Sequence, residues 1–237
     1  TCALPISLKE PVGQMTKYSG RLHKMLVKDA APVEYYFHLE GPDAEAAKST
    51  PINQYLGQTL SMRFTGKINC IACDREIKTS YQQGYCFPCT QKLAACDMCI
   101  LKPENCHFHL GTCREPEWGL AHCFIPHIVY LANSSGVKVG ITRETQVPTR
   151  WIDQGAEQAI AVVEVPNRYL AGIAEVALKN HFSDKTNWRK MLTNDIVTTD
   201  LIQERLKLQQ LLPTEVQEFF YLDKNDVYEM SYPVLKY

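Results

Sequence analysis

Alternating apolar and polar residues mark the first part of the chain as rich in β-strands. The runs at 20–28, 33–40 and 58–66 carry β-branched and aromatic residues in imperfect alternation, a pattern typical of short strands with one buried face. The segments between them, AAP and GPDAEAAKSTP, consist largely of turn-forming and polar residues. The pattern therefore predicts a β-rich N-terminal module over residues 1–66.

After residue 127 the periodicity indicates strands that alternate with helices. IVYLA and VKVGIT flank the turn formers NSSG, which predicts a β-hairpin with a longer loop. A short helix follows between Pro148 and Gly155, and AIAVVEV reads as the next strand. RYLAGIAEVALKNHF then places apolar residues at the spacing of one buried helix face. These are Leu170, Ile173, Ala174, Ala177 and Leu178.

The remaining segments complete an α+β protein of four predicted parts. TTDLIQERLKLQQLL reads as a helix ended by Pro213, and a strand is expected near VYEMSYPV. The expected parts are the β-rich module 1–66, a cysteine-rich module 67–126, an α/β domain 127–192 and a helix-and-strand extension 193–237.

Composition favours a soluble globular protein. The chain has 237 residues, of which 45% are hydrophobic and 22% charged, enough to bury a core. It contains no apolar run of the roughly 18 residues that span a bilayer. Its start, TCALPISLKE, lacks the cationic and apolar segments of a secretory signal. We therefore expect a cytoplasmic protein with no membrane partner, and the sequence does not set its oligomeric state.

Cysteine is the strongest compositional signal. The chain has ten cysteines, and because no secretory signal is expected, metal binding is favoured over disulfides. The pattern C-x2-C-x12-C-x2-C is typical of a structural zinc site with four sulfur ligands. A redox-active pair is disfavoured because the surrounding pattern is not βαβ. The predicted ligands are Cys70, Cys73, Cys86 and Cys89.

A second group of ligand-type residues follows in CDMCILKPENCHFHLGTCREPEWGLAHC. Cys96 and Cys99 form another C-x2-C pair, and Cys106 with Cys113 is the set we favour to complete a second zinc site. The competitors His107, His109, His122 and Cys123 stay open as alternatives. Two structural zinc ions are thus predicted, and the spacing favours zinc over an iron–sulfur cluster.

Charge limits the kind of nucleic-acid contact that the chain can make. Its net charge is −1, and residues 128–192 hold eight Lys and Arg against six Asp and Glu. No segment is a polycation, whereas sequence-independent duplex binding needs clustered positive charge. Any contact with DNA or RNA must therefore be local, on a surface whose shape fits the nucleic acid.

The hairpin carries a resemblance to a known family. The run VYLANSSGVKVGITR, followed by Arg150 and then Glu175, resembles the GIY-YIG endonuclease superfamily. In that family a hairpin carries two signature tripeptides, and an arginine and a glutamate follow from successive helices. Tyr130 falls in the first tripeptide, which lacks the usual glycine, and Lys138 stands where many members have tyrosine. GYCFPC, GTCREPEWG and RWIDQGA also resemble a bacterial domain of unknown function.

The resemblance implies a Mg²⁺-dependent phosphodiester hydrolase. Glu175 would hold the magnesium ion, Arg150 would clamp the phosphate, and Tyr130 or Lys138 would orient or deprotonate the attacking water. The side chains of Glu175, Arg150 and Tyr130 are expected to converge on a solvent-open hollow. The residues expected to contact nucleic acid are Arg143, Trp188, Arg189 and Lys190.

Alternatives remain for the site and for the whole chain. Glu175 could instead pair with Lys179 on an exposed helix face, and Arg150 with Asp153. The leading hypothesis is a zinc-containing protein that interacts with DNA or RNA and hydrolyses phosphodiesters. One rival is a non-catalytic zinc protein that binds RNA, the ribosome or DNA, and the other is a protein-interaction adaptor.

Overall fold

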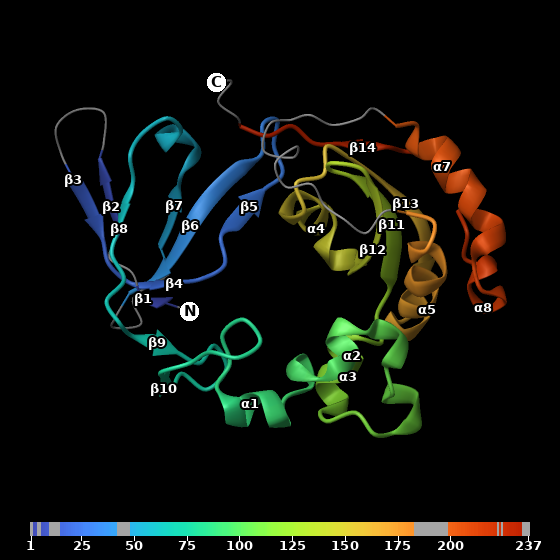
Figure 1. The fold of residues 1–237 in the computed structure, drawn as a ribbon, viewed down its shortest axis with the longest axis horizontal. Helices are drawn as coiled ribbons and strands as arrows, with labels where there is room; N and C mark the ends of the chain where they lie inside the picture. The colour runs from blue at the N-terminus through green and yellow to red at the C-terminus, as the bar shows by residue number, and fades with distance from the viewer. Residues whose placement is uncertain are drawn as a thin grey trace. The chain divides into compact units, whose positions relative to one another are not determined.

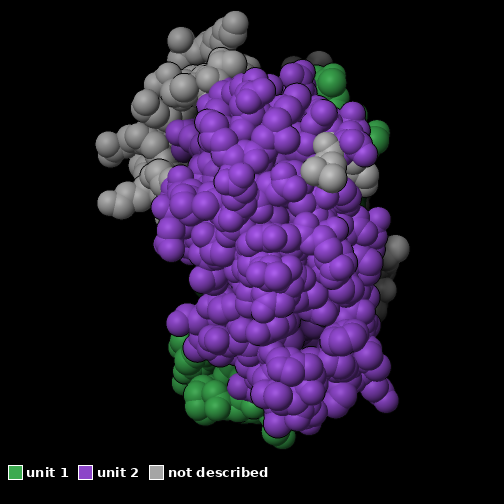
Figure 2. Space-filling view, turned by 90° about the vertical axis from the view of Figure 1, so that its right-hand side faces the viewer, with its two compact units in different colours: residues 1–96, 232–237 green, residues 97–231 purple. Residues whose placement is uncertain are grey.

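The computed structural model describes residues 2–3, 6–9, 15–41, 48–182, 199–221, 223 and 225–233. It divides into two compact units, residues 1–96 with 232–237 and residues 97–231, which Figure 2 colours separately. Helices and strands mix along the chain, which confirms the predicted α+β class. The finer division into four modules stays a prediction.

Among its described residues, the first unit is built on antiparallel sheets. The larger sheet has the strand order β10-β9-β1-β4-β6-β5, with β7 also paired to β6. Its strands are β1 (Cys2–Ala3), β4 (Arg21–Leu22), β5 (Leu26–Lys28), β6 (Glu34–Glu40), β7 (Lys48–Pro51), β9 (Ile68–Asn69) and β10 (Glu76–Ile77). The smaller sheet has the order β3-β2-β8, from β3 (Met15–Tyr18), β2 (Ile6–Lys9) and β8 (Ser61–Met62).

The predicted strands of this unit are present but shorter than the sequence suggests. The run 33–40 becomes β6, while 20–28 divides into β4 and β5 with residues 23–25 between them. Leu39 and Tyr55 are buried at the centre of a small core. The Asn53 side chain accepts a hydrogen bond from the Tyr35 N–H and donates one to the Val33 carbonyl. This pins the 3-10 turn η1 (Asn53–Tyr55) against the start of β6.

The cysteine-rich part after β10 consists of short helical turns. The first unit holds α1 (Phe87–Lys92) and η2 (Ala94–Cys96). The second unit holds α2 (Met98–Leu101), η3 (Pro103–Asn105), η4 (Phe108–Leu110) and α3 (Pro116–His122). Proline stands in the first turn of α1, η3 and α3, where its missing N–H costs no hydrogen bond.

A four-stranded antiparallel sheet organises the second unit (Figure 1). Its order is β12-β11-β13-β14, and the strands are β11 (His127–Asn133), β12 (Val137–Arg143), β13 (Gln158–Val165) and β14 (Tyr228–Glu229). Strands β11 and β12 form the hairpin that the sequence predicted, closing at the pair Asn133–Val137. Every residue of β11 is buried, because side chains pack on both faces of this central strand, Leu178 of the core on one face and Trp151 on the other.

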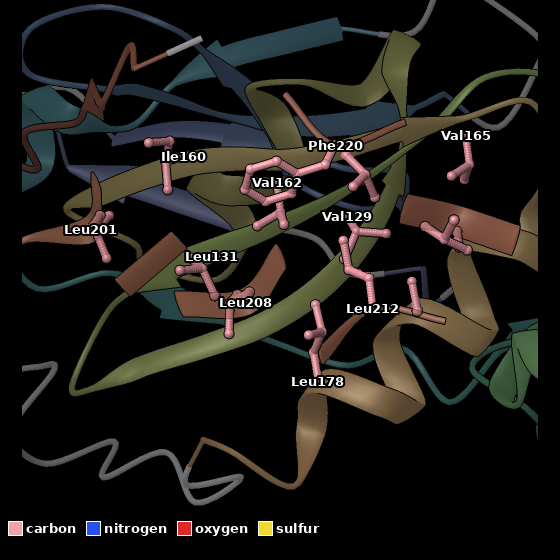
Figure 3. Packing of buried hydrophobic residues seen from close by; sticks show 14 residues of the cluster. Val129, Leu131, Ile160, Val162, Val165, Leu178, Leu201, Leu208, Leu212 and Phe220 are labelled. Carbon is pink, nitrogen blue, oxygen red and sulfur yellow. The ribbon is translucent and has the colours of Figure 1, made fainter. Parts of the chain in front are cut away.

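Helices complete the second unit. They are η5 (Glu144–Gln146), α4 (Thr149–Asp153), α5 (Arg168–Lys179), α7 (Leu201–Leu208), η6 (Gln209–Leu211) and α8 (Thr214–Gln217). Val129 and Leu131 of β11 pack against Leu178 of α5 and Leu208 of α7 (Figure 3). None of the described helices has the length and apolar character needed to cross a membrane.

The buried face of α5 is wider than its periodicity predicts. Ala174 and Leu178 are buried as expected, but so are Ala171 and Gly172. A Cβ on Gly172 would lie 2.3 Å from the Glu104 nitrogen, so the backbone of η3 packs directly on the helix there. α5 therefore has two partners, the sheet and the cysteine-rich turns of the same unit.

Candidate functional site

Four cysteines of the first unit form a preassembled metal-binding group. The sulfur atoms of Cys70, Cys73, Cys86 and Cys89 all lie within 4.8 Å of one another. Those of Cys73 and Cys86 are 3.7 Å apart. All four are free thiols. Four sulfurs at this spacing suit a tetrahedral zinc ion and leave no ligand position open for substrate, so the group could hold a structural metal.

Local backbone geometry brings the two pairs of cysteines together. The first pair lies in a tight turn between β9 and β10, in which the Cys70 N–H donates to the Arg75 carbonyl and the Asp74 N–H to the Cys70 carbonyl. Asp74 adopts a positive φ of 57° to close this turn. The second pair lies at the start of a helix, since Cys86 is the N-cap of α1 and Pro88 occupies its first turn.

Hydrogen bonds prepare one of these sulfurs to carry negative charge. Burial raises the pKa of the Cys70 thiol, but backbone N–H groups, chiefly those of Cys73 and Cys86, outweigh burial and bring the pKa to about 6. A hydrogen bond with Cys86 raises the pKa of Cys89 to about 12. A divalent cation would displace the protons that remain on these thiols, since cysteine binds zinc as the thiolate.

The second group of predicted ligands is distributed over both units. Cys99, Cys106 and Cys123 are buried in the second unit, and Cys113 is half-buried there. Cys96 ends the first unit, where it lies near Tyr85 as Cys70 and Cys89 do.

The competing histidines have partners of other kinds. His109 packs on the Tyr169 ring, 5.3 Å between centroids. His122 stacks on Trp118 at 4.1 Å and has its Nδ1 2.9 Å from the Trp118 carbonyl oxygen. His107 has its Nδ1 2.7 Å from the Thr112 hydroxyl.

A second candidate site lies on the face of the hairpin opposite the core. Tyr130 pairs with Gly140 across the two strands, and its ring lies over that glycine. A Cβ at Gly140 would be 2.7 Å from the phenol oxygen and 2.8 Å from Cζ. Glycine thus leaves room for the ring to cross the edge strand β12. The register of β13 also shifts between Val129 and Tyr130, and bulges of this kind often re-aim a side chain.

Three polar side chains surround the Tyr130 hydroxyl. Gln154 donates a hydrogen bond to it at 2.7 Å, and Arg150 donates another. The Glu175 carboxylate is near enough to act on the same group. Burial raises the pKa of the Tyr130 phenol, and the hydrogen bonds and the positive charge of Arg150 oppose this rise without reversing it. Tyr130 is therefore a neutral phenol at physiological pH.

The surroundings of the Tyr130 hydroxyl are less open than the sequence led us to expect. Arg150 is exposed and Glu175 half-buried, but the Tyr130 side chain is 0% exposed. The expectation of a solvent-open phenol is therefore wrong, because the ring is packed between Gly140 and Trp151, whose ring centroid lies 5.9 Å away. Arg150, Tyr130 and Glu175 nevertheless share one neighbourhood.

The other predicted contacts lie elsewhere or cannot be placed. Lys138 is half-buried on β12, two residues from Gly140 and so on the same face of the strand. Arg143 pairs with His127 at the far end of the hairpin, near Arg168 and Cys123. Trp188, Arg189 and Lys190 fall outside the described residues.

A comparison with family profiles identifies the relatives of the chain. The profile described as "Protein of unknown function (DUF2797)" matches residues 57–237. The chain belongs to the DUF2797 family. No curated protein and no solved structure matches it.

The DUF2797 match encloses both candidate sites. Residues 57–237 contain every cysteine but Cys2, together with the whole hairpin, α4 and α5. The resemblance to a domain of unknown function is thereby confirmed. Sequence reasoning missed Gln154, although its position one helical turn after Arg150 could have suggested a shared face. It also missed that Gly140 makes space for the Tyr130 ring.

Proposed function

We propose that this DUF2797 protein is a zinc-stabilised protein that binds nucleic acid and hydrolyses its phosphodiesters beside the β11–β12 hairpin. One observation carries the proposal: Arg150, Glu175 and Gln154, from two helices, all act on the hydroxyl of Tyr130. The order of hairpin, helix with arginine, strand and helix with glutamate also supports it, since the resemblance to the GIY-YIG superfamily implies this order.

Arg150 has the exposure and chemistry to bind a phosphate. Its side chain reaches solvent, and a guanidinium can donate two parallel hydrogen bonds to phosphate oxygens. The hydrogen bond from Arg150 to Tyr130 uses only part of its donor capacity and fixes its direction. We assign Arg150 the role of clamping the scissile phosphate.

Glu175 supplies the carboxylate that the reaction needs. Mg²⁺ binds through one or two protein carboxylates and keeps several waters, and a half-buried glutamate on α5 suits that requirement. When bound, Mg²⁺ would stabilise charge on the phosphoryl oxygens and on the leaving oxygen. Glu175 would also orient an attacking water by accepting its hydrogen bond.

Tyr130 takes a positioning role in this proposal. Its raised pKa makes it a poor base, and its buried ring holds the hydroxyl fixed between Arg150 and Gln154. Lys138, on the same face of β12, remains the candidate for proton transfer. The chemistry would then take place on the exposed side of Arg150.

The buried phenol favours a second candidate function. A protein that only binds RNA, the ribosome or DNA needs Arg150 and Lys138 to contact phosphates but has no need of an accessible Tyr130. Tyr130 is 0% exposed, which fits such a binding role as a packed scaffold residue. Binding without cleavage is the outcome that would select it.

The experiment is incubation of the zinc-loaded full chain with branched, duplex and single-stranded DNA and RNA in Mg²⁺. We expect cleavage that Glu175→Gln and Arg150→Lys reduce at least 100-fold, because each change removes a contact made to the charged transition state. Glu218→Ala, an exposed carboxylate of the same unit, is the matched control. Equal cleavage by all variants would refute the assignment, and binding without any cleavage would select the non-catalytic function.

A further inference from the structure

Four cysteines of the second unit gather around the turns that pack on α5. Cys99, Cys106 and Cys123 have relative exposures of 8%, 8% and 5%, and Cys113 is half-buried nearby. All four are free thiols. Cys106 and Cys123 line the same cavity of about 180 Å³, and Cys123 lies within electrostatic range of Cys106 and Cys113.

One arginine of α5 ties two of these cysteines together. The Arg168 guanidinium donates to the carbonyl of Cys99 at 3.4 Å and to that of Ile100 at 2.7 Å. The backbone N–H of Arg168 donates to the Cys123 carbonyl at 2.8 Å. Segments 24 residues apart in sequence are therefore fixed to one residue.

Close backbone packing fixes the positions of Cys113 and Cys106. Cys113 Sγ would lie 3.2 Å from a Cβ at Gly119, whose carbonyl accepts the Cys123 N–H at 2.8 Å. The Cys106 N–H donates to the Pro103 carbonyl at 3.0 Å, in the turn that rests on Gly172. Each thiol is thus held on a short, supported turn.

The nearby carboxylate and imidazole already have structural roles. Asp97 is the N-cap of α2 and accepts the Cys99 N–H at 3.3 Å, and its other oxygen accepts from the Arg114 Nε at 2.6 Å. The ligand atoms of Asp97, Cys99 and His107 lie within 4.8 Å of one another. Asp97 and His107 hold the turns through Arg114 and Thr112. The His107 Nε2 lies 3.7 Å from Asp97 Oδ1, so the His107→Ala variant decides whether this histidine is also a ligand.

We propose that Cys99, Cys106, Cys113 and Cys123 bind a second zinc ion as a four-thiolate site within the second unit. Cys123 takes the place that the spacing of the sequence suggested for Cys96. Among the described residues, no three of these four sulfurs lie within 4.8 Å of one another as the Cys70 group does, so binding requires the turns and side chains to move together around the ion. The site does not depend on the proposed hydrolysis.

Charge balance supports a metal at this position. Binding of Zn²⁺ by four thiols releases four protons and leaves a complex of net charge −2. The guanidinium groups of Arg168 and Arg143 lie within electrostatic range of Cys123 and would offset that charge. This gives Arg143 a role beside the metal centre.

The test is the zinc content of the purified full chain, measured by plasma mass spectrometry after dialysis against a weak chelator. We expect two zinc ions per chain in the wild type and one in Cys123→Ser or Cys106→Ser. Cys89→Ser should lose the first site and keep the second. Cys96→Ser and His107→Ala should keep both.

Several results would overturn the proposal. These are a single zinc in the wild type, loss of the second zinc in Cys96→Ser or His107→Ala, or its retention in Cys123→Ser. A count of six thiols after denaturation, in place of ten, would show disulfides instead. Cobalt substitution guards against misfolding of a variant, because the sulfur-to-cobalt absorption of the wild type should correspond to eight thiolates and that of Cys89→Ser to four.

Discussion

Replacement of Gly140 by alanine tests whether the hairpin is shaped around the Tyr130 ring. The added Cβ would lie 2.7 Å from the phenol oxygen, whereas ordinary contact begins near 3.4 Å, so the ring must move by about 0.7 Å. It has little room to do so, since Tyr130 is 0% exposed and its hydroxyl is bonded to Gln154 at 2.7 Å.

The expected cost follows from these contacts. Overpacking of a filled site costs about 1–3 kcal/mol, and loss of the hydrogen bond to Gln154 adds about 1 kcal/mol. We therefore expect Gly140→Ala to lower the free energy of unfolding by about 2–4 kcal/mol, which corresponds to a Tm lower by roughly 4–16 °C. Urea unfolding followed by tryptophan fluorescence measures it, because Trp151 lies beside the Tyr130 ring.

A double-mutant cycle with Tyr130→Val isolates the steric cause. Once the ring is gone, the methyl group at position 140 meets no phenol, so the two changes should be non-additive by at least about 1 kcal/mol. A Gly140→Ala protein within about 0.5 kcal/mol of the wild type, or strictly additive changes, would refute the idea that the ring requires glycine.

Three further predictions concern the second unit. Asp200→Ala should lower the unfolding free energy by about 1 kcal/mol, because Asp200 caps α7 by accepting two N–H groups; an unchanged midpoint in urea would contradict it. Tyr221→Phe should cost about 1–2 kcal/mol, since the hydroxyl donates to Glu164 at 2.5 Å, and Glu164→Gln should reduce that penalty. Burial lowers the pKa of His127 from 6.5 to about 4, so the unfolded chain takes up its proton first and stability should fall by about 3 kcal/mol as pH drops from 6.5 to 4. His127→Asn, which can still bond the Ile125 carbonyl, should flatten that pH dependence, and equal slopes for both proteins would contradict it.

Much of the second unit could be predicted from the sequence because its signals are local. The hairpin follows from two β-branched runs around NSSG, and α4 and α5 follow from proline, glycine and helical periodicity. The first cysteine group was also readable, since two close pairs at a fixed separation leave few arrangements. Local patterns did not predict contacts between segments far apart in the chain. One such contact is that of η3 with Gly172, which buries a face of α5 that the periodicity left exposed.

The candidate site shows the same division between local and long-range information. The types of side chain at positions 130, 150 and 175 were readable, but the burial of Tyr130 was not, because it depends on Gly140 across the hairpin and on Trp151 from another element. The second cysteine group stays a prediction, for a related reason. Spacing pairs Cys96 with Cys99, whereas Arg168 of α5 ties Cys99 to Cys123.

Helix α5 connects the cysteine turns with the hairpin site. Arg168 begins it and fixes the segments of Cys99 and Cys123. Glu175 follows seven residues later, which at 1.5 Å per residue is about 10 Å along the axis, and acts on Tyr130. A short helix packed on both sides transmits displacement of one end to the other. A metal held by the four cysteines of the second unit would therefore set the position of Glu175 without contacting any substrate. Removal of this metal should weaken the site at Glu175 before the strands of the hairpin separate.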